Sequence, residues 1–252
     1  MKRRFGVLVP PVNVAVENEF SRFLPPMMEM HVGRLLRREL VMSAKSQKEM
    51  LASAEPVSES LMRTQPEVLL FCCTSASFMD GLGKDMEISN WLEELTGVPA
   101  ATTSTAVVKA LKDCGAKRIL LFTPYSEDYN ALARSFFEQN GFKVEHLLGF
   151  HCKTPDITGT VESSRVAEML LRERARVAEV DAVFISCCNL HAMDQVAMLE
   201  AELGKPVLSS NSCTLWWAID RMGLARTRLG LGQAFDGISA SRSGTACDTA
   251  VA

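Results

Sequence analysis

The chain has 252 residues, of which 47% are hydrophobic and 23% charged, and its formal net charge is −3. This composition can fill a sizeable core and has no basic excess, so we expect neither a nucleic-acid nor a membrane partner. The apolar run Phe5–Val9 behind the basic start is too short for a secretion signal or a membrane span. Eight cysteines without such a signal indicate reduced thiols, so we expect a cytoplasmic protein.

Short apolar runs alternate with longer segments of helical spacing along the chain. The expected strands are Phe5–Val9, Val68–Phe71, Ala100–Thr102, Arg118–Phe122, Lys143–Leu148, Ala182–Ile185 and Val207–Ser209. The expected helices are Lys45–Arg63, Thr105–Cys114, Tyr125–Asn140, Ser163–Ala178, Ala192–Leu203 and Thr214–Met222, three of which Gly115, Gly141 and Gly204 would cap. This alternation predicts an α/β fold with parallel sheets, in which ligands bind at the carboxyl ends of the strands.

Two of the expected strands run directly into a cysteine followed by small polar residues. Cys73 and Cys187 are 114 positions apart, and so are Pro10 and Pro124 of two other strand ends. A shared offset of this kind indicates an internal duplication. We therefore predict two similar Rossmann-like halves related by a pseudo-twofold, with the active site in the cleft between them. The first half would be residues 1–103, completed by the C-terminal segment 212–252, and the second would be residues 104–211.

The two cysteines carry the expected chemistry. A thiol between a strand and a helix lies near the positive end of the helix dipole, so we expect thiolates with a lowered pKa at Cys73 and Cys187. Thr74 and Ser75 can donate to a carboxylate or to a developing enediolate, and the second half offers Asn189. Donors from the hydroxyl-rich turns would be Ser104 and Asn211.

The other cysteines have a simpler interpretation as small buried side chains. Because neighbouring strand residues point in opposite directions, we expect Cys72 and Cys188 to be packing residues. The same is expected of Cys114, Cys152, Cys213 and Cys247. A four-cysteine zinc site is conceivable, but the usual Cys-x-x-Cys spacing is absent and we predict no metal. His191 is expected as a cap or surface residue, and Trp216 and Trp217 as packing or subunit-contact residues.

Several motifs together resemble one family. They are Val9-Pro-Pro-Val-Asn13 with Glu17, Cys73-Thr-Ser-Ala-Ser77, Thr102-Thr-Ser-Thr-Ala106, Thr123-Pro-Tyr125, Ser186-Cys187 with Asn189-Leu190, and Ser209-Ser-Asn211 with Trp216. This ordered set is similar to the aspartate/glutamate racemase superfamily, and within it to the branch of maleate cis-trans isomerases and arylmalonate decarboxylases. The resemblance covers nearly the whole chain. It implies cofactor-independent chemistry at the α-carbon of a small carboxylate, with thiols in the interdomain cleft.

The resemblance also implies roles for two further residues. Asn13 occupies a position at which isomerase-like members carry a carboxylate-binding asparagine and decarboxylase-like members tend to lack it. Tyr125, the counterpart of Pro11 in the first half, would be a second carboxylate donor. Cys188 departs from the threonine that is common in the isomerase pattern, so one local donor is replaced.

The expected function is the cis-trans isomerisation of maleate to fumarate, in which Cys73 adds to the alkene, the single bond rotates, and Cys187 takes part before elimination. The partner would be a small carboxylate, and a homo-oligomer is expected. Three alternatives stay open. The stretch Ser77-Phe-Met-Asp-Gly81 resembles the arylmalonate decarboxylase form, a two-thiol amino-acid or hydantoin racemase fits the paired cysteines, and a non-catalytic carboxylate-binding sensor could retain the same fold.

Overall fold

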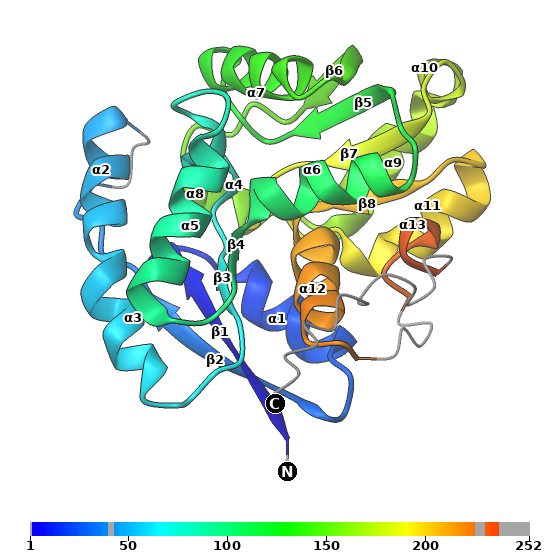
Figure 1. The fold of residues 1–252 in the computed structure, drawn as a ribbon. Coiled ribbons are helices and arrows are strands. Elements are labelled where there is room, and N and C mark those ends of the chain that lie inside the picture. Colours follow the sequence, from blue (N-terminus) through cyan, green and yellow to red (C-terminus); the bar gives the residue numbers. More distant parts are fainter. Residues whose placement is uncertain (1, 40–42, 225–229, 237–252) are drawn as a thin grey trace, which may run out of the picture.

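The computed structural model describes residues 2–39, 43–224 and 230–236, and their strands form two four-stranded parallel sheets (Figure 1). The first sheet has the order β2-β1-β3-β4 and the second has the order β6-β5-β7-β8. The strands are β1 (Arg3–Val9), β2 (Met28–Arg34), β3 (Leu69–Phe71), β4 (Ala100–Thr102), β5 (Arg118–Thr123), β6 (Lys143–Gly149), β7 (Ala182–Ile185) and β8 (Val207–Ser209). The equivalent orders confirm the prediction of two similar α/β halves.

The central strands explain why their sequences are so apolar. All residues of β3 and β7 are buried, because helices cover both faces of a parallel sheet. In the first half β1 pairs with β3 through Gly6 and Leu69, and in the second half β5 pairs with β7 through Ile119 and Ala182. Since the strands are parallel, the loops that follow them all leave from one edge of each sheet.

Helices follow the strands in both halves. They are α1 (Ala15–Phe23), α2 (Ala44–Ala52), α3 (Ala54–Met62), α4 (Thr74–Phe78), α5 (Lys84–Thr96), α6 (Thr103–Asp113), α7 (Glu127–Gln139), α8 (Pro155–Thr158), α9 (Ser163–Arg172), α10 (Arg174–Ala178), α11 (Val196–Leu203), α12 (Ser210–Arg221) and α13 (Gln233–Asp236). None of these is both long and apolar enough to cross a membrane.

The helices α6 and α12 occupy equivalent places after the last strand of each sheet, and they pack against each other (Figure 1). Each begins with a hydroxyl cap. The Thr102 side chain accepts from the Thr105 N–H at 3.1 Å, and the Ser209 side chain accepts from the Ser212 N–H at 3.0 Å. Caps of this kind satisfy N–H groups that have no partner in the first turn of a helix. The hydroxyl-rich turns therefore start the two helices that join the halves.

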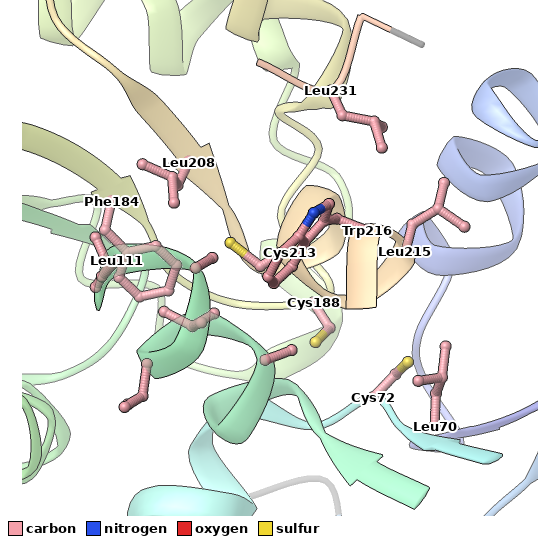
Figure 2. Close-up of a cluster of buried hydrophobic side chains, with 14 of the residues drawn as sticks. Leu70, Cys72, Leu111, Phe184, Cys188, Leu208, Cys213, Leu215, Trp216 and Leu231 are labelled. Atoms are coloured by element: carbon pink, nitrogen blue, oxygen red, sulfur yellow. The ribbon is translucent and has the colours of Figure 1, made fainter. Parts of the chain in front are cut away.

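A core of buried side chains continues across this junction (Figure 2). Cys213 and Trp216 of α12 are buried in it, and the Trp216 ring stacks on Phe235 of α13 with 5.3 Å between centroids. Trp217 packs at its edge. The expectation of packing roles for Cys213 and Trp216 is confirmed. Cys247 lies outside the described residues.

The C-terminal segment does not pack on the first half alone. Helix α12 contacts α1, β3 and β4 of the first half, and also α6 and β8. Helix α13 contacts α6 and β8. Residues 225–229 and 237–252 of the segment lie outside the described part of the chain. What the structure shows of this segment is thus a bridge between the halves.

Every strand that the sequence predicted is present, but other elements differ from expectation. Strand β2 was not foreseen, because it is an edge strand whose middle residues are only half-buried and include Glu29 and His31. The helix expected over Lys45–Arg63 is divided into α2 and α3 at Ser53, whose Oγ accepts from the Leu36 N–H at 2.9 Å. A serine that bonds to a distant backbone competes with helix continuation.

Candidate active site

A cavity of about 180 Å³ lies between the halves at the carboxyl ends of both sheets. Its walls come from the loops that follow β1, β2 and β3 in the first half and β5, β6 and β7 in the second half. Of the predicted site residues, those that line it are Asn13, Cys73, Thr74, Ser75, Tyr125, Cys187 and Asn189. Asn211 is not among the lining residues. The structure thus brings together side chains from both halves, as expected for a cleft site in this fold.

Cys73 follows β3 and stands at the N-cap position of the short helix α4. Its backbone is extended, with φ −143°, and the residue is 7% exposed. The Ala76 N–H donates to its sulfur, and Ser75 Oγ lies 3.8 Å from Sγ. The first-half thiol is therefore nearly enclosed, with donors supplied by the next turn of chain.

Cys187 follows β7 in a different conformation. Its φ is +104°, in a region that non-glycine residues rarely adopt. Its own N–H donates to Ser210 Oγ at 2.9 Å, and the Asn189 N–H donates to its Sγ at 3.4 Å. A strained residue of this kind persists only where surrounding contacts fix it. The helix α12, through Ser210, is one such contact.

The expectation of lowered thiol pKa values is wrong for this site. Burial raises the pKa of Cys73, and it outweighs the opposing effects of the Ala76 N–H, the Ser75 hydroxyl and the Arg37 charge. Burial also raises the pKa of Cys187 strongly, and the neighbouring Cys188 adds to that effect. The free-energy cost of removing a thiolate from water exceeds the stabilisation that a few N–H hydrogen bonds provide. At neutral pH both thiols are therefore protonated.

Tyr125 is a neutral hydrogen-bond donor beside the second-half thiol. Its hydroxyl lies 3.1 Å from Ser186 Oγ and hydrogen-bonds the Cys187 thiol. Burial raises the pKa of Tyr125 well above its ordinary value, and the nearby Cys187 contributes to the rise. The phenol therefore keeps its proton and can donate to a carboxylate or to an enediolate oxygen.

The two asparagines that line the cavity also hold its walls. Asn13 Nδ2 donates to the Cys188 carbonyl at 3.0 Å, and its Oδ1 accepts from the Val16 N–H at 3.0 Å. Asn189 Nδ2 donates to the Val12 and Pro155 carbonyls, while its Oδ1 accepts from the Val14 N–H. Both hydrogens of the Asn189 amide are thus used within the protein, and this side chain fastens the two halves together.

Asn211 lies behind the cavity wall. Its Nδ2 donates to Glu19 Oε2 at 2.6 Å and to the Cys188 carbonyl at 3.2 Å. Glu19 in turn accepts the N–H groups of Ala192 and Met193. The predicted contact of Asn211 with substrate is therefore replaced by a supporting position under the Cys187 turn. Ser104, another expected donor, is fully buried and bonds to Ser77 instead.

Hydroxyl and thiol groups connect the two cysteine turns inside the protein. Thr74 Oγ1 lies 3.3 Å from Cys188 Sγ and 3.0 Å from Ser210 Oγ, and Thr103 Oγ1 lies 3.1 Å from the same sulfur. Cys72 and Cys188 belong to the buried core, as expected, although both also reach the cavity wall (Figure 2). The pKa of Cys188 is raised to about 12 by burial, against the effect of Thr103 and Thr74. This thiol is therefore a neutral hydrogen-bonding group.

Several lining residues were missed from the sequence as site residues, and four of them, apart from the two core cysteines above, carry a charge, a phenol or a thiol. Arg37 lies in the loop after β2, Tyr129 in the first turns of α7, and Cys152 and Lys153 in the loop after β6. Cys152 was expected only to pack. The carboxyl-end rule would have found the loop after β6, because that strand was predicted, but it could not find the loop after the unpredicted β2. Among the described residues, no group of three or more His, Cys, Asp or Glu is placed to hold a metal ion.

Comparison with known proteins by sequence gives matches over nearly the whole chain. The model of the arylmalonate decarboxylase family matches residues 5–235. The chain is 28% identical to arylmalonate decarboxylase of Bordetella bronchiseptica over 240 residues, which cover 92% of this chain and 95% of that protein. It is also 28% identical to maleate isomerase of Nocardia farcinica over 216 residues, covering 82% and 85%.

A solved structure agrees with these sequence matches. The Nocardia farcinica maleate cis-trans isomerase, in a cysteine-to-serine variant with a covalently bound succinylcysteine intermediate, superposes with a TM-score of 0.85 at 23% identity and covers 95% of this chain and all of that one. The match shows the same fold, and the resemblance seen in the sequence motifs is confirmed. From its fold, its cleft and the match over nearly its whole length, the chain belongs to the arylmalonate decarboxylase family, whose relatives include the maleate isomerases.

Proposed function

We propose that the protein is a cofactor-independent cis-trans isomerase of a small unsaturated dicarboxylate, with maleate and fumarate as the leading pair. The observation that carries the proposal is the position of Cys73 and Cys187. The two thiols come from equivalent turns of the two halves and line the same cavity. The succinylcysteine of the Nocardia farcinica enzyme supports a route in which a cysteine sulfur bonds to a substrate carbon.

In the proposed route the Cys73 thiol gives its proton to a carboxylate of the substrate as its sulfur forms a bond to one alkene carbon, and the same carboxylate returns the proton when the sulfur leaves. The π electron pair moves toward the carboxylate on the other carbon and generates an enediolate. The neutral Tyr125 hydroxyl can donate to the oxygen on which this charge develops. The remaining carbon–carbon single bond rotates, and the return of the electron pair expels the Cys73 sulfur as the trans product forms.

In the proposed route Cys187 acts at the other alkene carbon, where the negative charge develops. With its pKa raised, its thiol carries a proton that it can lend to the carbanionic carbon and take back before elimination. Because the same sulfur gives and recovers the same proton, the hydrogens of the alkene are retained. The two thiols then have different tasks on one substrate, which fits their different environments.

One alternative has its own support. An arylmalonate-type decarboxylase would need only Cys187 to protonate the carbon from which carbon dioxide has left. This thiol alone bonds to Tyr125 and lies in the strained turn. The family match and the Bordetella bronchiseptica relative favour the same reaction class. The alternative leaves Cys73 without a chemical task, and for that reason we place it second.

Proton NMR in deuterium oxide tests the proposal. We expect the protein to convert maleate to fumarate with its carbon-bound hydrogens largely retained. Cys73→Ala should reduce the rate by at least about 10³-fold, because it removes the attacking sulfur, and Cys187→Ser should be strongly impaired. Cys114→Ser is the matched control, since that partly buried thiol bonds the Leu111 carbonyl and does not line the cavity.

The same instrument separates the rival reactions. If Cys73→Ala retains full activity while Cys187→Ser abolishes release of carbon dioxide from an arylmalonate, the protein is a one-thiol decarboxylase. Incorporation of deuterium at the α-carbon of aspartate would indicate a two-base racemase. Binding of these carboxylates without any turnover would indicate a sensor protein.

A further inference from the structure

Among the residues that the structure describes, two cations line the cavity, and each half supplies one of them. Arg37 lies three residues after the end of β2, and Lys153 lies four residues after the end of β6. The strands β2 and β6 are the equivalent edge strands of the two sheets. The loops that carry Arg37 and Lys153 are therefore equivalent in the pseudo-twofold arrangement, although the sequences of these loops differ.

The cavity walls carry no opposing charge in the part of the chain that the structure describes. Its described lining residues include these two cations and neither an aspartate nor a glutamate. A concave site whose wall has charges of one sign attracts ligands of the opposite sign and raises their local concentration. The wall is therefore suited to an anion, and its two positive charges match two carboxylates better than one.

The Arg37 charge acts at the Cys73 end of the cavity. It lowers the pKa of Cys73 and of Tyr129, although burial has the larger and opposite effect on both groups. The guanidinium is thus close enough to influence the first-half thiol. Tyr125, with its neutral hydroxyl, bonds to Cys187 instead. A ligand that reaches from one thiol to the other would meet a neutral donor at one end and a cation at the other.

We propose that Arg37 is a specificity-determining residue that binds the second carboxylate of the substrate, at the Cys73 end of the cavity, while Lys153 helps to draw the dianion in. The site then selects dicarboxylates over monocarboxylates of the same length. This inference rests on the proposed function for its substrate class and does not depend on turnover. Arginine suits the task because its planar guanidinium can donate two parallel hydrogen bonds to one carboxylate.

Calorimetric titration with succinate and butyrate tests the assignment. Both probes are saturated, so neither thiol can add to them, and they differ by one carboxylate. We expect wild type to bind succinate more tightly than butyrate, and Arg37→Gln to weaken succinate binding about tenfold, the effect of losing one charged hydrogen-bonding partner. Butyrate binding should change by less than about twofold, because it lacks the second carboxylate. Arg37→Lys retains the charge and should restore part of the succinate affinity.

Arg38→Gln is the matched control, because it removes the same charge one residue further on. The Arg38 side chain is 93% exposed, pairs with Glu49 and does not line the cavity. Its succinate affinity should equal that of wild type. Lys153→Gln should weaken succinate binding mainly at low salt, as expected for long-range attraction.

Three results would overturn the assignment: equal loss for succinate and butyrate in Arg37→Gln, no loss for either probe, or wild type that fails to prefer succinate. If the discrimination is found but maleate is not isomerised, the proposed function fails and the assignment of Arg37 stands.

Discussion

The turn at Cys73 and the turn at Cys187 follow equivalent strands of the two sheets, yet they are held in different ways. The Cys73 turn is held mainly from within its own half, where its N–H donates to the Phe71 carbonyl and its carbonyl accepts from Ser77. The Cys187 turn is held from outside. Its N–H donates to Ser210 of α12, and the Cys188 carbonyl accepts from Asn13 of the first half.

This difference shows what two equivalent halves can vary. The sheets fix where the two thiols emerge, and the residues behind each turn fix the backbone conformation and the surroundings of the sulfur. An extended backbone at Cys73 costs nothing, whereas φ +104° at Cys187 requires external support. Equivalent positions can therefore take unequal chemical roles. The predictions that follow test this inequality.

The largest expected effect concerns thiol reactivity. Because the pKa values of both Cys73 and Cys187 are raised, alkylation by iodoacetamide should be slow at about pH 7 and should accelerate about tenfold per pH unit up to about pH 9. Cys73 should react ahead of Cys187, because burial raises the pKa of Cys187 strongly, whereas at Cys73 the Arg37 charge partly offsets the effect of burial. Mass spectrometry of digests taken over time measures each rate. A rate that is already at its plateau near neutral pH for either thiol would contradict the raised pKa values.

A smaller effect is expected from removal of the support behind Cys187. Ser210→Ala deletes the acceptor of the Cys187 N–H, and we expect kcat to fall about tenfold with little change in KM, together with a loss of about 1–2 kcal/mol in the free energy of unfolding. Ser210→Thr keeps a hydroxyl and should restore kcat.

Thr103→Val is the matched control for this substitution. Thr103 occupies the equivalent place at the start of α6. Its hydroxyl donates to the Phe71 carbonyl at 3.4 Å and lies 3.1 Å from Cys188 Sγ, but it accepts from neither the Cys73 N–H nor the Cys187 N–H. It should lose stability while kcat stays near that of wild type. Equal loss of kcat in Thr103→Val and Ser210→Ala would mean that both hydroxyls act only through general packing.

The fold was predictable wherever the pattern was local. Buried strands are apolar along their whole length, and the offset of 114 residues between Cys73 and Cys187 placed the second half from the first. Strand β2 was missed because an edge strand with charged residues has no such pattern. Because β2 was not predicted, the loop that follows it and carries Arg37 was not considered as part of the site.

The candidate site was predictable in position and less so in chemistry. The carboxyl-end rule placed the two thiols in one cavity, and the family resemblance added Tyr125 to it. It could not show that the Asn189 amide is used by backbone groups from two other loops, nor that burial raises the thiol pKa values. Hydrogen-bond partners and burial depend on which segments meet in three dimensions, and one sequence does not contain that information. The roles of the lining residues toward substrate stay predictions.

The smallest expected effect is a pH dependence of stability that arises from a carboxyl group behind the Cys187 turn. Glu19 of α1 is buried, and its carboxyl group accepts from Ala192, Met193 and Asn211 beneath that turn. Burial raises its pKa, and these hydrogen bonds only partly oppose the rise. The folded protein therefore holds the Glu19 proton to a higher pH than the unfolded chain does.

Between the ordinary glutamate value and the raised value, the unfolded state binds fewer protons, so the free energy of unfolding falls as pH increases. Each pKa unit of elevation corresponds to about 1.4 kcal/mol. Urea unfolding of wild type and Glu19→Gln from about pH 4 to about pH 8 measures the free energy of unfolding of each protein. As pH rises, wild type should lose stability relative to Glu19→Gln, and the difference should then become constant. Parallel curves would show that Glu19 titrates normally. In that case the carboxyl group would be better solvated than its position implies, and the Cys187 turn would be less firmly held than the Cys73 turn.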